Sequence, residues 1–88
     1  MKIGKRIDAA MAQARKRLGR ELTRAEARRV GKRVALAERL AVARQDWWEW
    51  ACLAARYDSP ANRQRERAAR RVRNDLIVQL AGVSRETP

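Results

Sequence analysis

All four aromatic side chains of this 88-residue chain lie within eleven consecutive positions, and this clustering limits where a core can form. The segment holds Trp47, Trp48, Trp50 and Tyr57 together with Cys52, the single cysteine. Elsewhere the chain is rich in alanine and arginine and has no phenylalanine. Buried alanine contributes little transfer free energy, so we expect a thin core that is centred on the aromatic segment or completed by a partner.

Apolar residues recur at intervals of three and four, which is the spacing of one face of an α-helix. The first such stretch, residues 3–18, precedes Gly19, a residue type that often ends a helix in the left-handed conformation. Thr23 and Glu26 have the capping-box spacing, in which each side chain accepts a hydrogen bond from the other residue's backbone N–H. They predict a second helix over residues 24–57.

A third helix is predicted over residues 60–81. Ser59 is a favoured N-cap residue, and Pro60 suits the first helical position because its fixed φ angle matches the helix. We expect Gly82 to end this helix, with residues 84–88 as a frayed tail.

These elements predict a single helical domain over residues 1–88. Its fold class is all-α: a three-helix chain with a long central helix, packed as a small bundle or helical hairpin. Because the core is expected to be thin, we also expect self-association, most simply as a homodimer.

An alternative arises at Gly31, the internal weak point of the central helix. Ala27, Gly31, Ala37 and Leu40 loosely follow the spacing of a helix-turn-helix, which would make the protein a transcriptional regulator. Lys32, however, occupies a site that is usually apolar in that motif. A continuous helix through Gly31 is therefore the first interpretation.

The tryptophans point in different directions on the predicted helix. At 100° per residue, Trp47, Trp48 and Trp50 together cover about 160° of the helix surface, too wide an arc for one neighbouring helix. We expect Trp47 and Trp50 in the core and Trp48 as a surface anchor, with Tyr57 as a further partner contact. Cys52, which has no histidine partner, is expected to be a buried structural thiol.

Basic residues outnumber acidic residues by 22 to 10, which gives a net charge of +12. The charge is segregated: residues 1–33 carry +9, residues 34–58 carry −1, and residues 59–88 carry +4. Such a surface attracts polyanions, and two basic stripes at helical spacing favour nucleic-acid binding over ordinary solvated helix faces. The candidate phosphate contacts are Arg24, Arg28, Arg29, Lys32, Arg33, Arg63, Arg67, Arg70 and Arg71.

Catalysis has little support in the composition. The chain has no histidine, and no metal-ligand set, glycine-rich phosphate loop or paired carboxylate site is evident. We therefore expect no enzymatic activity, no metal and no cofactor. The longest uncharged run, residues 76–84, is shorter than the roughly 20 residues that span a bilayer, so we expect no membrane partner. A single cysteine is typical of a cytoplasmic protein.

The sequence thus predicts a small basic non-enzymatic protein that binds nucleic acid or a nucleoprotein complex, largely without sequence specificity. The alternative is a protein-binding inhibitor of a host complex that uses the tryptophan-rich patch, because tryptophan and arginine dominate interface energetics. In general type the chain is similar to many small phage and plasmid proteins that act in this way, anti-CRISPR proteins among them. The similarity is one of type, since no residue matches a particular family.

Overall fold

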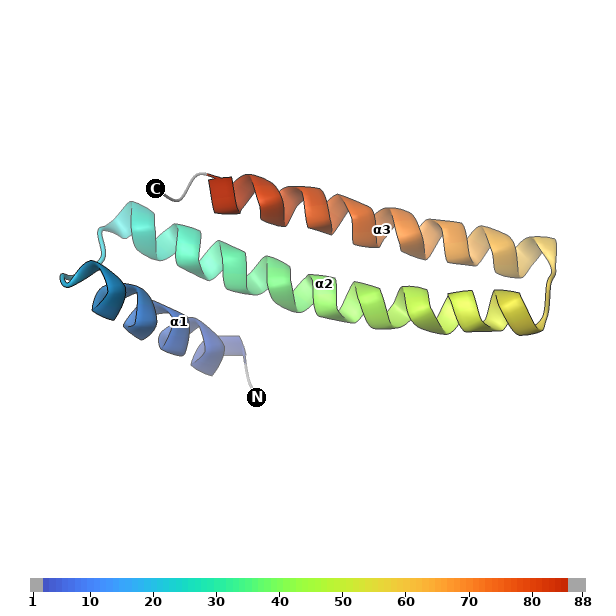
Figure 1. The fold of residues 1–88 in the computed structure, drawn as a ribbon, viewed down its shortest axis with the longest axis horizontal. Coiled ribbons are helices and arrows are strands. Elements are labelled where there is room, and N and C mark those ends of the chain that lie inside the picture. Colours follow the sequence, from blue (N-terminus) through green and yellow to red (C-terminus); the bar gives the residue numbers. More distant parts are fainter. Residues whose placement is uncertain (1–2, 86–88) are drawn as a thin grey trace.

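The structure, a computed structural model, describes residues 3–85 and consists there of three α-helices joined by two short connections (Figure 1). Helix α1 covers Ile3–Leu18, α2 covers Arg24–Arg56 and α3 covers Pro60–Arg85. These described residues contain no strand. The all-α class and the three-helix order are confirmed, and α2 is the longest helix, with 33 residues.

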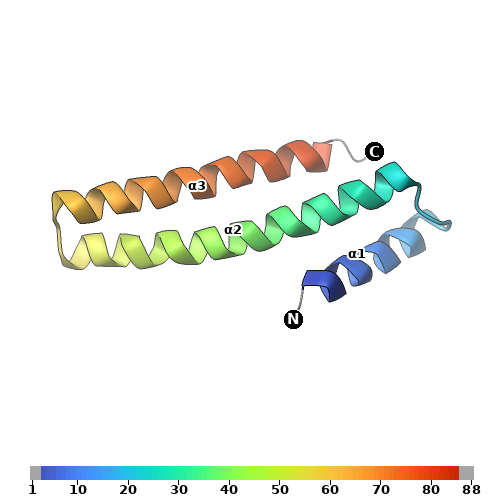
Figure 2. The same ribbon diagram turned by 180° about the vertical axis from the view of Figure 1, so that it is seen from behind.

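The helices lie side by side in an open layer. α2 and α3 form an antiparallel hairpin, and α1 lies on the opposite side of α2, where it contacts α2 but not α3 (Figures 1 and 2). The molecule measures 55 × 25 × 16 Å. Its radius of gyration is 16.9 Å, whereas a compact chain of this length has a radius of gyration of about 12 Å. The arrangement is therefore a helical hairpin with one appended helix, not a closed bundle.

The ends of α1 and α2 follow their local signals. Gly19 has φ 70°, and its backbone N–H donates to the carbonyl oxygen of Arg15 over 2.9 Å, as expected of a left-handed helix end. At the start of α2, the Glu26 N–H donates to Thr23 Oγ1 over 3.1 Å, and the Thr23 N–H donates to Glu26 Oε1 over 2.9 Å. The predicted capping box is confirmed.

A tight connection joins α2 to α3. The Asn62 backbone N–H donates to Ser59 Oγ over 3.1 Å, which confirms Ser59 as the N-cap of α3. The Asn62 side-chain amide also donates to the carbonyl oxygen of Tyr57 over 2.9 Å. The second bond joins Tyr57, the C-cap residue of α2, to the first turn of α3, so the connection is closed by a contact across five residues.

The predicted end of α3 is wrong. The helix does not end at Ala81 but continues through Gly82 to Arg85, so the first part of the predicted tail is helical. Val83 is only 4 % exposed and belongs to the hairpin core. Burying a valine contributes about 1.5–3 kcal/mol, more than the roughly 1 kcal/mol that an internal glycine costs. Residues 86–88 of the predicted tail lie outside the described residues.

The helix-turn-helix alternative is also wrong. α2 runs without interruption through Gly31, so the turn on which that alternative depended is absent. Val30 before this glycine and Leu36 after it are both buried, so the helix is packed on both sides of its weakest residue. The long central helix predicted from the spacing is confirmed.

The core lies in the hairpin, and its centre is not the aromatic segment. The buried cluster contains Leu36, Leu40, Ala43, Leu76 and Val83, with Leu80 packed against it. Around it, Trp47 and Trp50 are only half-buried, so the expectation that both belong to the core is met in part. α1 adds little, since Ala14 is its buried residue. The thin core agrees with the scarcity of large apolar residues.

Candidate nucleic-acid interface

The outer arginine stripe, defined as Arg63, Arg67 and Arg71, lies on the exposed face of α3. Spaced four residues apart, the three side chains share one side of the helix. They line a shallow polar groove along α3 with Pro60, Gln64 and Ala68. Arg63 is paired with Asp58 over 3.2 Å, whereas Arg67 and Arg71 form no ion pair or hydrogen bond with the part of the chain that the structure describes. Two guanidinium groups are therefore free to bind an external anion.

Other arginines of α3 are occupied by contacts within the protein. The Arg65 guanidinium lies over the Trp50 ring, 5.0 Å from its centroid, and that of Arg73 lies 4.3 Å from the Trp47 ring centroid. Such cation–π contacts contribute about 0.5–1 kcal/mol at exposed sites. These two side chains hold α3 against the aromatic segment.

Arg70 is part of a hydrogen-bond network that reaches Trp47 in the aromatic segment. Its Nη2 donates to Glu66 Oε2 over 3.0 Å, while Glu66 Oε1 accepts from Trp47 Nε1 over 3.1 Å. Arg70 was one of the predicted phosphate contacts. The structure shows that it forms an ion pair with Glu66, one turn earlier on α3, and its role as a phosphate contact stays a prediction.

A second basic stripe, which we call the α2 basic stripe, comprises Arg24, Arg28 and Lys32. All three side chains are exposed, and none pairs with a residue between positions 3 and 85. Arg28 and Lys32 line a shallow hollow with Ala25 and Arg29. This stripe offers a second set of cations at the other end of the hairpin.

The remaining two candidates of this region lie closer to α1. Arg29 and Arg33 are half-buried, and both line the hollow between α1 and α2 beside Arg17. They belong to the inner side of α2 rather than to the exposed stripe.

The two stripes are far apart. Arg67 lies in the part of α3 that packs beside Trp47, as the Trp47–Glu66 hydrogen bond shows. Arg28 precedes Trp47 by 19 residues along α2, a distance of about 30 Å at 1.5 Å per residue. The antiparallel hairpin therefore separates the basic residues into two sites instead of one continuous patch.

The aromatic segment leaves Trp48 uncovered. Its side chain is 58 % exposed, and its ring centroid lies 6.1 Å from that of Trp47, with an angle of 57° between the ring planes. Tyr57, at the end of α2, is 61 % exposed. The predicted exposure of Trp48 is confirmed, and its role as a partner anchor stays a prediction.

Cys52 corrects an expectation. It was predicted to be a buried thiol, but it is exposed. α1 covers α2 only as far as the region of Glu38, which pairs with Arg6 near the start of α1. Cys52 lies fourteen residues further along, about 21 Å away, where neither α1 nor α3 covers that side of α2.

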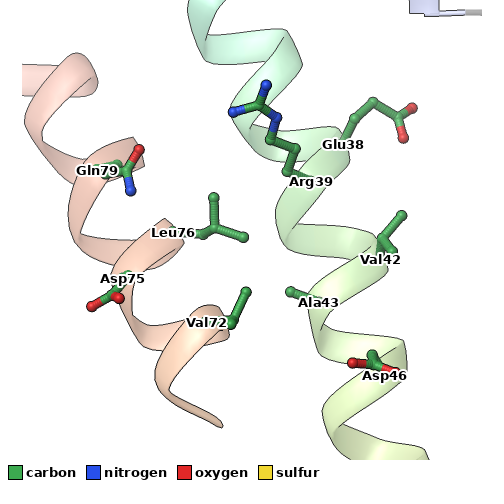
Figure 3. A pocket seen from close by; sticks show the side chains of 9 residues that line it. All are labelled: Glu38, Arg39, Val42, Ala43, Asp46, Val72, Asp75, Leu76 and Gln79. Carbon is green, nitrogen blue, oxygen red and sulfur yellow. The ribbon is translucent and has the colours of Figure 1, made fainter. Parts of the chain in front are cut away.

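Sequence reasoning missed a groove between α2 and α3 (Figure 3). Its apolar lining comes from Val42, Ala43, Val72 and Leu76, and its polar lining from Glu38, Arg39, Asp46, Asp75 and Gln79. Figure 3 shows Val72 and Leu76 facing Ala43, with Arg39 and Asp46 on either side of Ala43 along α2. The groove could not be predicted because its two walls lie about thirty residues apart in the chain.

The carboxylate of Glu26 is strongly perturbed by the groups around it. Hydrogen bonds from the Arg20 guanidinium, at 2.8 and 3.0 Å, and from the Thr23 N–H lower the pKa of Glu26 to about 2. The same carboxylate raises the pKa of Arg20. Glu26 caps α2 as a carboxylate, and the perturbation is structural.

Residues 3–85 hold neither a metal-binding cluster nor a membrane-spanning helix. These residues contain no cluster of three or more side chains suited to holding a metal ion. No helix among them has the length and apolar character needed to cross a bilayer. The chain was also compared with protein-family models, curated proteins and solved structures, and no match was found.

Proposed function

We propose that this protein binds nucleic acid through the outer arginine stripe, without enzymatic activity and largely without sequence specificity. The observation that carries the proposal is that Arg67 and Arg71 are exposed on one face of α3 and have no partner within the described chain. Arginine suits this role because its planar fork can donate two hydrogen bonds to one phosphate. A cytoplasmic location is part of the proposal.

The dimensions of the stripe fit a phosphate backbone. From Arg63 to Arg71 the helix rises about 12 Å, a length over which one strand of a duplex carries three to four phosphates. Contacts of this kind fix the position of a protein on the backbone but do not read bases. The α2 basic stripe would add contacts about 30 Å away on an extended nucleic acid or on a nucleoprotein complex.

Replacing both free arginines tests the stripe. The double variant Arg67→Gln/Arg71→Gln should bind a random-sequence duplex at least tenfold more weakly, because it loses two charge-assisted contacts of about 1.5 kcal/mol or more each. The slope of log K against log salt concentration should become less steep by about 1.8, which is 0.9 for each lost phosphate contact. Fluorescence anisotropy at several salt concentrations around 0.1 M measures both effects.

A matched control separates the stripe from net charge. Arg44 and Arg56 are exposed on α2 and form no ion pair with the described residues, so Arg44→Gln/Arg56→Gln removes the same charge outside both stripes. This control should keep most of the affinity. Equal losses in the two double variants would contradict a site on α3, and binding of the unaltered protein only at very low salt would contradict the function itself.

A second candidate function rests on the exposure of Trp48. A large aromatic side chain that no helix covers is a typical anchor of a protein interface, where tryptophan and arginine often dominate the binding free energy. The partner would be a protein, such as a component of a host complex that this chain inhibits.

The two candidates give different results in a pull-down from nuclease-treated host lysate. If Trp48 anchors a protein partner, Trp48→Ala should abolish capture while far-UV circular dichroism remains unchanged, because the side chain is exposed. Val78→Ala, an exposed apolar position on α3, is the control and should capture normally. Undiminished capture by Trp48→Ala would reject this anchor.

A further inference from the structure

The groove between α2 and α3 has apolar side chains that remain exposed to solvent in the monomer. Val42 is 68 % exposed and Val72 is 54 % exposed, although both line the same groove as the buried Leu76. No residue of α1 lines the groove, because α1 packs on the other side of α2. The apolar surface of the hairpin thus continues outward from the core, and no part of residues 3–85 covers it.

Two charged side chains flank this surface symmetrically. Arg39 precedes Val42 by three residues, and Asp46 follows Ala43 by three residues. They are about 10 Å apart along α2, and neither forms an ion pair with any described residue. If a second α2 lay across the first in the antiparallel direction, centred between Val42 and Ala43, each Arg39 would meet the other copy's Asp46.

We propose that a second copy of this chain docks on this face, so that two hairpins form a four-helix assembly with α2 antiparallel to α2 and α3 antiparallel to α3. The contact is isologous: each copy gives the same surface, and the Arg39–Asp46 pairing occurs twice. Val42 of each copy then lies close to the twofold axis. This inference concerns the partner of the groove and does not depend on nucleic-acid binding.

The size of the face suits a stable dimer. α3 has 26 residues and is about 39 Å long, and two adjacent helices are about 20 Å wide. The face therefore covers about 800 Å², which is the area that each partner buries in an interface of standard size.

The charge distribution favours this face over the others. A chain of net charge +12 repels a second copy across its basic surfaces. The groove instead carries Arg39 and Asp46, which the antiparallel arrangement pairs between copies, so two copies can meet there without bringing the basic stripes together. The outer arginine stripe lies on the side of α3 that faces away from α2, and it stays accessible.

Two exposed valines provide a matched test. Val42 lies in the groove, whereas Val78 lies on α3, is 70 % exposed and does not line the groove. In sedimentation equilibrium at about 100 μM, the unaltered protein and Val78→Glu should be dimers, and Val42→Glu should be a monomer with unchanged helicity. A monomeric unaltered protein, or equal dissociation of both variants, would overturn the proposal.

Charge reversal tests the register. Arg39→Asp alone should weaken the dimer at least tenfold, because each introduced carboxylate would face the other copy's Asp46. The double variant Arg39→Asp/Asp46→Arg should recover the dimer. Recovery cannot arise within one chain, since the two side chains are about 10 Å apart on the same helix. Failure of the double variant to recover would reject the antiparallel register.

A disulfide cross-link locates the axis. With Cys52 replaced by alanine, Val42→Cys should form a cross-linked dimer under mild oxidation, and Val78→Cys should not. In the proposed arrangement the two native Cys52 residues are about 28 Å apart, so the unaltered dimer should not cross-link. A disulfide at Cys52 or at position 78, or none at position 42, would place the interface elsewhere.

Discussion

At the scale of single residues, the arginines of α3 have similar spacing in the sequence but different roles in the structure. Arg65 and Arg73 stack on tryptophan rings, and Arg70 pairs with Glu66. Arg67 and Arg71 face solvent without a partner among the described residues. The free arginines are the ones that point directly away from α2. Binding capacity therefore depends on the direction of each side chain and not on the number of arginines.

Glu26 leads to a pH prediction at the same scale. Its folded-state pKa is lowered to about 2 by the Arg20 guanidinium and the Thr23 N–H. Because the pKa is lowered on folding, the ionised carboxylate contributes its full stabilisation at pH values above its ordinary pKa of about 4.5. This stabilisation is lost as the pH falls towards about 2. Glu26→Gln should therefore be less stable than the unaltered protein near pH 7, and the difference should shrink towards pH 2.

Urea unfolding followed by circular dichroism at several pH values measures this convergence. Arg20→Gln should reduce the pH dependence as Glu26→Gln does, because its hydrogen bonds are the largest cause of the lowered pKa. An undiminished pH dependence in Glu26→Gln would contradict the assignment of this carboxylate.

At the scale of the elements, the end of α1 and the starts of α2 and α3 lie where a local hydrogen-bond partner exists, and the end of α3 differs from them. Thr23 and Ser59 cap the starts of α2 and α3, and Gly19 ends α1. The end of α3 is the exception, since packing of Val83 extends it past Gly82. Local signals thus determine a helix end unless a buried contact beyond that end is worth more free energy.

Two glycines should respond in opposite directions to replacement by alanine. Gly31 lies inside α2, and a Cβ atom there would meet no other atom within 4 Å, so Gly31→Ala should stabilise the protein by about 0.5–1 kcal/mol. Gly19 has φ 70°, and Gly19→Ala should destabilise the protein by about 1–2 kcal/mol. Midpoints of thermal or urea unfolding measure both. A destabilising Gly31→Ala would indicate that α2 bends at this glycine.

At the scale of the whole molecule, the open layer explains why so much apolar surface remains exposed. α1 covers only the first half of one side of α2, and α3 covers the adjacent side. Trp48 and Cys52 lie beyond α1, and Val42 and Val72 lie on the open face of the hairpin. A layer of three helices has two broad faces, and it has no second layer to shield the apolar side chains on either face from solvent.

The proposed dimer would also change how the protein presents its charge. With α3 antiparallel to α3, the two outer arginine stripes would lie along one edge of the assembly, with the two copies of Arg67 about 25 Å apart. A single nucleic-acid strand or duplex could then contact both stripes. Dimer formation and nucleic-acid binding remain separately testable, because the groove and the stripe share no residue.

Much of the fold could be predicted because its signals are local. The capping box at Thr23, the left-handed Gly19 and the cap at Ser59 each act within four residues. The exposure of Trp48 was also predictable from the angular width of the tryptophan cluster. The buried state expected for Cys52 was wrong, because it depends on how far α1 extends along α2. The partners of Arg70 and the walls of the groove depend in the same way on α3.

The sequence by itself determined the helices, their order and the basic character of the chain, because backbone hydrogen bonds, caps and net charge depend on nearby residues or on composition. The tertiary structure decided which side of each helix is covered. Packing joins residues far apart in the chain, and burial free energy depends on that packing. For this reason the free arginines of α3 and the exposed valines of the groove became visible only when the helices were placed side by side.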